Sequence, residues 1–127
     1  MNQLLTPPPA KSPMAIFKTR LAYTHWLKLY RKIAKPERFG IGEKIDILFL
    51  ETLDIIHSSR YIPLSSKLPY LEKSIDKIDK IKFFAEISWE NKLMTAREYS
   101  ELLDQLERIG RELGGWKKAM ISKNSRT

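Results

Sequence analysis

Apolar residues recur at intervals of three and four along four stretches of the chain. This spacing follows the 3.6-residue turn of an α-helix, so each stretch is predicted to form an amphipathic helix. The first helix is expected over residues 14–34, because Pro36 cannot continue it, and the second over about 42–59. No stretch alternates between apolar and polar residues for long enough to predict a strand.

The third and fourth helices carry recognisable start signals. The third is expected to begin between residues 65 and 69 and to end near 89, with Ser66 as its cap. The fourth is expected to run to residue 120, and Thr95 and Glu98 have the spacing of a capping box at its start. Short connections place consecutive helices side by side in opposite directions. The predicted fold is therefore an all-α, antiparallel up-down-up-down four-helix bundle.

The domain organisation follows from this pattern. The 127 residues suffice for one domain with its own core. Residues 14–120 are predicted to form the bundle, and the proline-rich residues 1–13 a flexible tail. Residues 121–127 are predicted to be a disordered basic C-terminus.

Three of the five glycines, Gly110, Gly114 and Gly115, fall inside the fourth predicted helix. Glycine costs about 1 kcal/mol in a helix interior relative to alanine. One interpretation is that the helix ends there with a glycine cap. The other, which we favour, is that the helix continues to Trp116 and beyond, because the apolar pattern does, and that a neighbour packs closely against Gly110 and Gly114.

Charge narrows the class of partner. The net charge is +8, and the first 42 residues hold eight Lys or Arg and one acid, whereas residues 43–64 hold two basic and four acidic residues. Such an excess favours a polyanionic or acidic partner. The chain has no cysteine, no apolar run long enough for a membrane span and no signal-peptide pattern at its start, so a cytoplasmic protein is expected.

No catalytic or metal-binding constellation is recognisable. His25 and His57 lie on different predicted helices without a second ligand at helical spacing, and the serines near residues 58 and 65 lack a nucleophile-elbow context. A phosphate-binding loop is also missing. We therefore expect a protein that is not an enzyme and needs neither metal nor cofactor.

A basic binding surface is the remaining candidate. The cations of the first, third and fourth helices recur at helical spacing and are predicted to contact nucleic acid, although charge runs also form ordinary solvated surfaces. These candidate residues are Lys18, Lys28, Arg31, Lys32, Lys35, Arg38, Lys73, Lys77, Lys80, Arg108, Arg111, Lys117 and Lys118. Tyr23, Trp26 and Tyr30 could stack on bases, but their positions in the apolar stripe favour the core.

Three segments resemble a known family. They read "ERFGIGEKIDILFLETLDII" at 37–56, "SIDKIDKIKFFAEI" at 74–87 and "YSELLDQLERIGRELGGWKK" at 99–118. The chain resembles the Avd family, the accessory variability determinants of diversity-generating retroelements, over about residues 15–120. This family belongs to a wider four-helix-bundle group that includes proteins encoded in ribosomal RNA intervening sequences.

The resemblance implies more than the residue pattern does. It implies a barrel-shaped homopentamer that binds nucleic acid and the retroelement's reverse transcriptase, and that supports mutagenic cDNA synthesis without being an enzyme. The RNA partner would be the template-repeat transcript, and RNA–DNA hybrids would also be bound. It also implies that the matched glycine motifs pack against a helix or a subunit, at Gly42, Gly110, Gly114, Gly115 and Trp116.

Two alternatives remain open from the sequence. The chain could be a bundle protein of a ribosomal RNA intervening sequence, with the same fold and no polymerase partner. It could also be a basic scaffold that binds an acidic protein.

Overall fold

The structure is a computed structural model that describes residues 14–125 and the side chains of 14–122. Four long helices and no strand make up this part of the chain, as the apolar periodicity predicted. They are α1 (Met14–Lys32), α3 (Glu43–Ser59), α4 (Leu68–Glu90) and α5 (Ala96–Ser125). The predicted tail at residues 1–13 lies outside the described residues.

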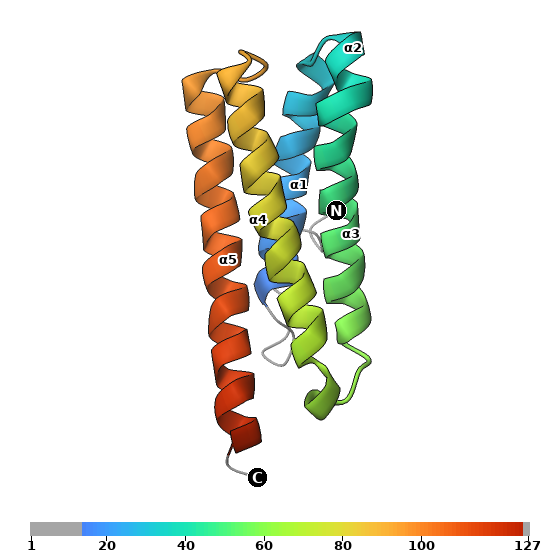
Figure 1. The fold of residues 1–127 in the computed structure, drawn as a ribbon, viewed down its shortest axis with the longest axis vertical. Coiled ribbons are helices and arrows are strands. Elements are labelled where there is room, and N and C mark those ends of the chain that lie inside the picture. Colours follow the sequence, from blue (N-terminus) through green and yellow to red (C-terminus); the bar gives the residue numbers. More distant parts are fainter. Residues whose placement is uncertain (1–13, 126–127) are drawn as a thin grey trace.

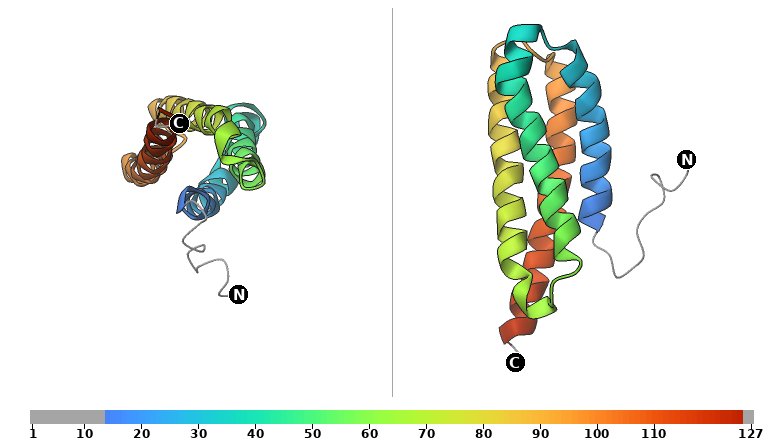
Figure 2. Two further views of the ribbon diagram at one scale, coloured as in Figure 1. Left: turned by 90° about the horizontal axis from the view of Figure 1, so that it is seen from below. Right: turned by 90° about the vertical axis from the view of Figure 1, so that its right-hand side faces the viewer.

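The helices surround one core. α1 packs against α3 and α5, and α4 packs against the same two helices, so each helix has two neighbours (Figure 2). The connections α1–α3 and α4–α5 lie at one end of the molecule, and the connection α3–α4 lies at the other (Figure 1). None of the described helices is long and apolar enough to span a bilayer.

The core is aromatic at its centre. Trp26 is fully buried and stacks on Tyr30 and on Phe49, with ring centroids 5.4 and 6.3 Å apart. Tyr23 makes a second ring contact from α1 to α3, 5.7 Å from Phe49. Isoleucine and leucine side chains of α4 and α5 complete the core. These aromatic rings join α1 to α3.

The α1–α3 connection is built from two short helical segments. α2 (Lys35–Glu37) has Pro36 in its first turn, and η2 (Arg38–Gly42) leads into α3. The backbone leaves helical geometry at Gly40, where φ is −104° and ψ is −107°. α1 ends before Pro36, as predicted, but at Lys32 and so two residues short of the expected residue 34.

The predicted start of α5 agrees with the structure, whereas the predicted cap of α4 does not. Pro69 lies in the first turn of α4 as expected, but Ser66 belongs to the preceding segment η3 (Leu64–Ser66) and Lys67 takes the cap position without a side-chain hydrogen bond. The predicted Ser66 cap is therefore wrong. The capping box of α5 is confirmed, because Thr95 Oγ1 accepts from the Glu98 amide at 3.1 Å and Glu98 Oε1 from the Thr95 amide at 2.9 Å.

α5 continues through its glycines. It extends to Ser125, five residues beyond the predicted end, so residues 121–125 are helical and not disordered. The alternative of a glycine cap at Gly114 or Gly115 is wrong. The last residues of the chain, 126–127, lie outside the described part.

Candidate nucleic-acid interface

Six of the predicted cations are free to meet a ligand. Each is exposed, and within the described residues none has a carboxylate oxygen within 4.0 Å. They are Lys28, Arg31, Lys35, Lys73, Arg111 and Lys118. An exposed cation without an acidic partner keeps its full charge for a phosphate group.

Six other predicted cations are paired with acids. Four of these pairs join different helices: Lys18–Glu112 at 3.1 Å, Lys32–Glu98, Lys77–Glu51 at 3.5 Å and Lys117–Glu72 at 3.5 Å. Two lie within one helix: Lys80–Asp76 at 2.9 Å and Arg108–Asp104 at 3.1 Å. These pairs reduce the attraction of the cations for an outside anion. The strip predicted from residues 28 to 35 is therefore split, because Lys32 points to α5.

Arg38 has a different task from the one predicted. Its guanidinium donates to the carbonyl oxygen of Ile33 from Nε at 3.1 Å and from Nη2 at 3.0 Å, and Nη2 also donates to the Arg31 carbonyl at 3.3 Å. The last carbonyls of a helix lack partners within it, so Arg38 closes the C-terminal end of α1. Its position just after a proline-terminated helix is the signal in the sequence for this role.

A row of polar contacts joins α1 to α5. Lys18 pairs with Glu112, His25 Nδ1 lies 2.7 Å from Gln105 Oε1, and Lys32 pairs with Glu98. From one contact to the next, the residue number rises by seven on α1 and falls by seven on α5. Two helical turns separate successive contacts on each helix, so this heptad seam sets the register of the two helices. The seam was not predicted from the sequence, because it joins residues that are far apart along the chain.

His25 is part of this seam. Its Nε2 lies 3.9 Å from a Glu101 carboxylate oxygen, while its other nitrogen faces Gln105. His57 is exposed near the end of α3, with its ring against Tyr61. The described residues contain no group of three His, Cys, Asp or Glu side chains placed to hold a metal ion.

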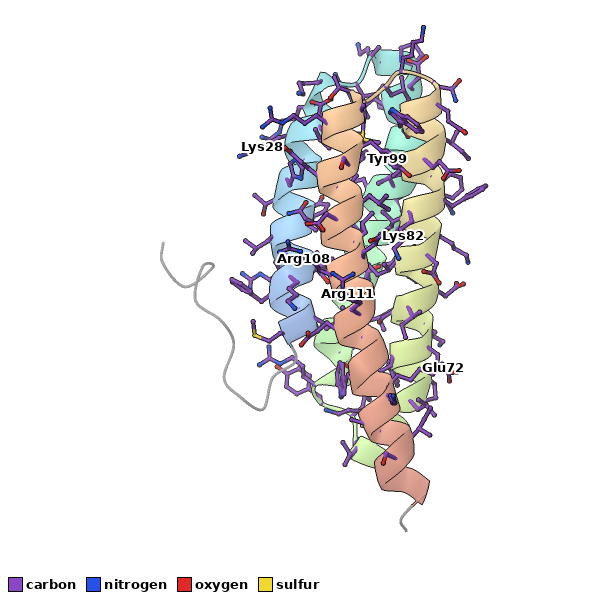
Figure 3. The ribbon with its side chains drawn as sticks, turned by 90° about the vertical axis from the view of Figure 1, so that its left-hand side faces the viewer. Lys28, Glu72, Lys82, Tyr99, Arg108 and Arg111 are labelled. Carbon is purple, nitrogen blue, oxygen red and sulfur yellow. The ribbon has the colours of Figure 1, made fainter. Side chains whose placement is uncertain are left out.

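Some of the free cations of α1 and α5 lie on one side of the molecule. Lys28 and Arg111 project from neighbouring helices, and Arg108 lies between them along the same face (Figure 3). Lys118 follows Arg111 by two helical turns on the outward side of α5. We call Lys28, Arg111 and Lys118 the α1–α5 cations.

The aromatic residues proposed for base stacking belong mainly to the core. Trp26 has no exposed surface, and Tyr23 and Tyr30 are partly buried against the core. Burial, and after it the Asp46 carboxylate, raise the pKa of Tyr23 to about 12. The core interpretation of Trp26 is confirmed, so this residue cannot stack on a base without unfolding.

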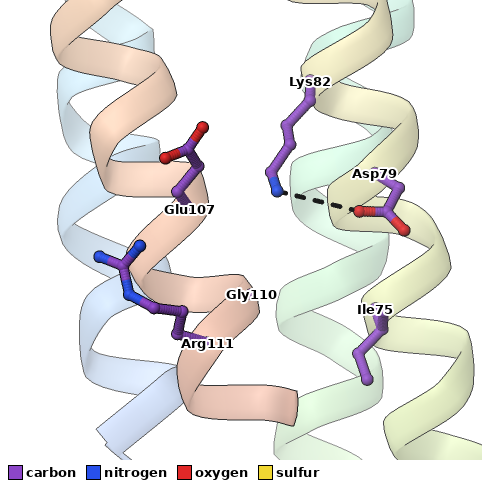
Figure 4. Close-up of a pocket in the computed structure, with 6 residues that line it drawn as sticks. All are labelled: Ile75, Asp79, Lys82, Glu107, Gly110 and Arg111. Carbon is purple, nitrogen blue, oxygen red and sulfur yellow. Dashed lines mark ion pairs between the residues drawn. The ribbon is translucent and has the colours of Figure 1, made fainter.

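Gly110 of α5 borders an open groove. The groove has a volume of about 310 Å³ between α4 and α5 and is lined by Ile75, Asp79, Lys82, Glu107, Gly110 and Arg111 (Figure 4). Lys82 is 3.9 Å from Asp79, and its Nζ is the nearest atom to a Cβ built on Gly110, at 3.7 Å. Acids and cations share this groove, so it lacks the uniform positive charge that a phosphate chain favours.

Close helix packing is absent at two of the three glycines. Apart from its chain neighbours and the backbone of its own helix, a Cβ built on Gly114 or Gly115 has no atom of the described residues within 4 Å. The prediction of a close neighbour at Gly114 is therefore wrong within the bundle. Packing of this glycine against another subunit stays a prediction. Trp116 is partly buried against the core, with Lys67 Nζ 5.7 Å from its ring centroid.

Gly42 is the glycine that a neighbour crowds. A Cβ built there would lie 2.8 Å from Tyr30 Cε1 and 3.2 Å from the Glu37 carbonyl oxygen. The Tyr30 ring is held by its stack on Trp26 and by a 3.1 Å hydrogen bond from its hydroxyl to the Arg38 carbonyl. Gly42 therefore allows the close approach of α1 to the start of α3.

No protein-family model, curated protein or solved structure matches the chain. The resemblance to the Avd family consequently stays a prediction based on the three segments described above.

Proposed function

We propose that this chain is a non-catalytic accessory protein of a diversity-generating retroelement. In this proposal it works in the cytoplasm, where it binds the element's reverse transcriptase and its template RNA and supports mutagenic cDNA synthesis. The observation that carries the proposal is the set of α1–α5 cations, which are exposed and have no acidic partner among the described residues. The segments resembling the Avd family supply the identity of the partners.

The assembly is part of the same proposal. We infer an antiparallel bundle that forms a ring-shaped homopentamer, and the heptad seam between α1 and α5 supports the antiparallel arrangement. Five copies would carry about +40, five times the +8 of one chain. A ring repeats the α1–α5 cations around its circumference, which suits a long polyanion more than a compact ligand.

The role of the cations follows from electrostatics. Each lysine or arginine that neutralises a phosphate releases a counterion, so affinity falls steeply as salt rises. Phosphate contacts carry no base information, so these residues account for affinity and not for the choice of RNA. Selection of the template RNA would come through the reverse transcriptase or through the shape of the RNA.

The interface is tested by binding of a fluorescein-labelled, mixed-sequence single-stranded RNA in fluorescence anisotropy over a salt series. Lys28→Gln with Arg111→Gln should weaken binding and reduce the slope of log K against log salt by about 0.7 for each lost contact. Helicity should not change, because both side chains are exposed.

The matched control is Lys80→Gln with Arg97→Gln. It removes the same two charges from exposed helix positions, but these cations are paired with Asp76 at 2.9 Å and Glu101 at 3.1 Å. We expect its salt slope to stay near that of the wild type. Equal losses in both variants would mean that net charge alone drives binding, and an unchanged Lys28 and Arg111 variant would exclude this face.

A further inference from the structure

The outward face of α3 differs from the basic face described above. Four of its residues, at spacings of four, three and four, lie opposite the buried side of the helix: Glu43, Ile47, Leu50 and Asp54. We call these four residues the α3 ridge. Ile47 and Leu50 are 44% and 46% exposed, and neither acid has an ion pair among the described residues. The ridge is apolar in the middle and acidic at both ends.

α1 carries a ridge with the same spacing and opposite charge. It consists of Arg20, Thr24, Leu27 and Arg31, which also lie opposite the buried side of their helix. We call these residues the α1 ridge. Both arginines are exposed and their guanidinium groups have no carboxylate within 4.0 Å in the described part of the chain. Leu27 is partly exposed between them.

The lengths of the two ridges agree. Eleven residues separate the two charges on each helix, which corresponds to about 16 Å at a rise of 1.5 Å per residue. One helix laid along the other can therefore bring both opposite charges together at once. Two such contacts at a fixed separation also set the register, as paired charges do along coiled coils.

The two ridges also lie at matching positions along the bundle axis of one molecule. Tyr30 lies beside Gly42 and Tyr23 beside Phe49, so a step of seven residues back along α1 corresponds to a step of seven residues forward along α3. On this scale Arg31 is level with residue 41 and Arg20 with residue 52. Each arginine is thus two residues, or about 3 Å, from the height of Glu43 or Asp54. An arginine side chain spans such an offset.

A second copy of the chain therefore fits the α3 ridge. Rotating a copy about an axis parallel to the helices keeps every residue at its height, and places its Arg31 opposite Glu43 and its Arg20 opposite Asp54. Leu27 then meets Ile47 between the two charge pairs. We propose that the α1 ridge of one subunit docks on the α3 ridge of the next.

Because the two ridges are different surfaces, the contact is head-to-tail. A rotation without a rise cannot build a filament, and it closes into a ring when a whole number of subunits completes one turn. This inference rests on the ring of the proposed function and identifies the surfaces that build it. It removes Arg31 from the predicted nucleic-acid site. Lys28, Arg111 and Lys118 remain available to RNA, since they do not belong to the ridge.

Other occupants fit the α3 ridge less well. Nucleic acid is repelled by two unpaired acids, and a purely apolar segment would leave both carboxylates desolvated without a partner. The second copy supplies a cation for each acid and an apolar side chain between them. The complementarity is thus present within the chain itself.

Charge reversal with rescue tests the contact. The α3 variant is Glu43→Arg with Asp54→Arg, the α1 variant is Arg20→Glu with Arg31→Glu, and the combined variant carries all four changes. Molar mass is measured by sedimentation velocity at low salt. We expect an oligomer for the wild type, loss to the 14.9 kDa monomer for the α1 and α3 variants, and recovery of the wild-type mass for the combined variant.

The control is Glu86→Arg with Glu90→Arg, which changes the charge by the same amount on exposed acids of α4 without an ion pair in the described residues. Its mass should equal that of the wild type. Circular dichroism checks that each variant stays helical, and recovery in the combined variant excludes misfolding as the cause of dissociation.

The outcomes separate this inference from the proposed function. If the wild type is an oligomer and the α1 and α3 variants both keep its mass, the ridge contact is wrong and the ring itself is not affected. The α3 ridge would then bind another protein. A wild type that is monomeric throughout would overturn the ring and the ridge contact together. Neither result bears on RNA binding by the α1–α5 cations, which the anisotropy experiment measures.

Discussion

At the scale of single residues, one glycine has a defined steric role. Gly42 lies where the Tyr30 ring passes over the start of α3, and that ring cannot move freely, because it stacks on Trp26 and bonds to the Arg38 carbonyl. By contrast, Gly115 has open space around the position of a Cβ. Two glycines in one protein thus have opposite expected responses to the same substitution.

Gly42→Ala should destabilise the protein. The added Cβ would be 2.8 Å from Tyr30 Cε1, and overpacking of this kind costs about 1–3 kcal/mol. Gly115→Ala is the matched control and should raise stability by up to about 1 kcal/mol, because alanine favours the helix. Urea unfolding at one protein concentration measures both. A Gly42→Ala variant as stable as the wild type would contradict the crowding at this position.

The sequence could not separate these glycines. Their positions in the apolar pattern predicted that the helix passes through Gly110, Gly114 and Gly115, and it does. Whether a neighbour approaches a glycine depends on how another helix packs against it. The apolar periodicity of a single helix does not predict that packing. The same limit applies to Arg38, whose hydrogen bonds to α1 depend on the turn after Pro36.

At the scale of elements, periodicity and caps account for most of the fold. The predicted and observed starts of α1 and α5 agree, and the boundaries of α3 and α4 differ by a residue or two. The end of α5 was missed because residues 121–125 contain too few apolar residues to extend the stripe. The heptad seam was missed because a contact between α1 and α5 joins residues far apart in the sequence.

Glu98 links the α5 cap to this seam. The hydrogen bond from Lys32, and after it the one from the Thr95 amide, hold the pKa of Glu98 below its usual value of 4.5. A carboxylate whose pKa is lower in the folded than in the unfolded protein stabilises the fold at pH values above its unfolded pKa. This contribution is lost as the pH falls through the folded pKa. Acid should therefore weaken the α1–α5 contact at this point.

Glu98→Gln should reduce the sensitivity to acid. At pH 7 it should cost about 0.2–1 kcal/mol, as for a surface ion pair, while the glutamine can still cap Thr95. Between pH 7 and pH 3 the variant should lose less unfolding free energy than the wild type. Glu107→Gln, at an exposed position without an ion pair in the described chain, is the control. Equal acid sensitivity of Glu98→Gln and the wild type would show that this carboxylate is not stabilised by folding.

At the scale of the whole molecule, charge is arranged by face. The α1–α5 cations are on one side, and the α3 ridge presents unpaired acids around an apolar centre. The sequence predicted a basic binding surface but not which cations are free, because pairing across helices depends on their register. In the proposed ring, one face contacts RNA while the α1 and α3 ridges join the subunits.

The proposed function depends most on the association of this protein with a reverse transcriptase and its template RNA. The most direct measurement is a pull-down of the tagged protein from its native host at moderate salt, with identification of bound proteins and sequencing of bound RNA. We expect recovery of a reverse transcriptase together with one dominant non-coding RNA, and loss of that RNA from the Lys28→Gln, Arg111→Gln variant. Recovery of ribosomal RNA fragments alone, or of an acidic protein without RNA, would contradict it.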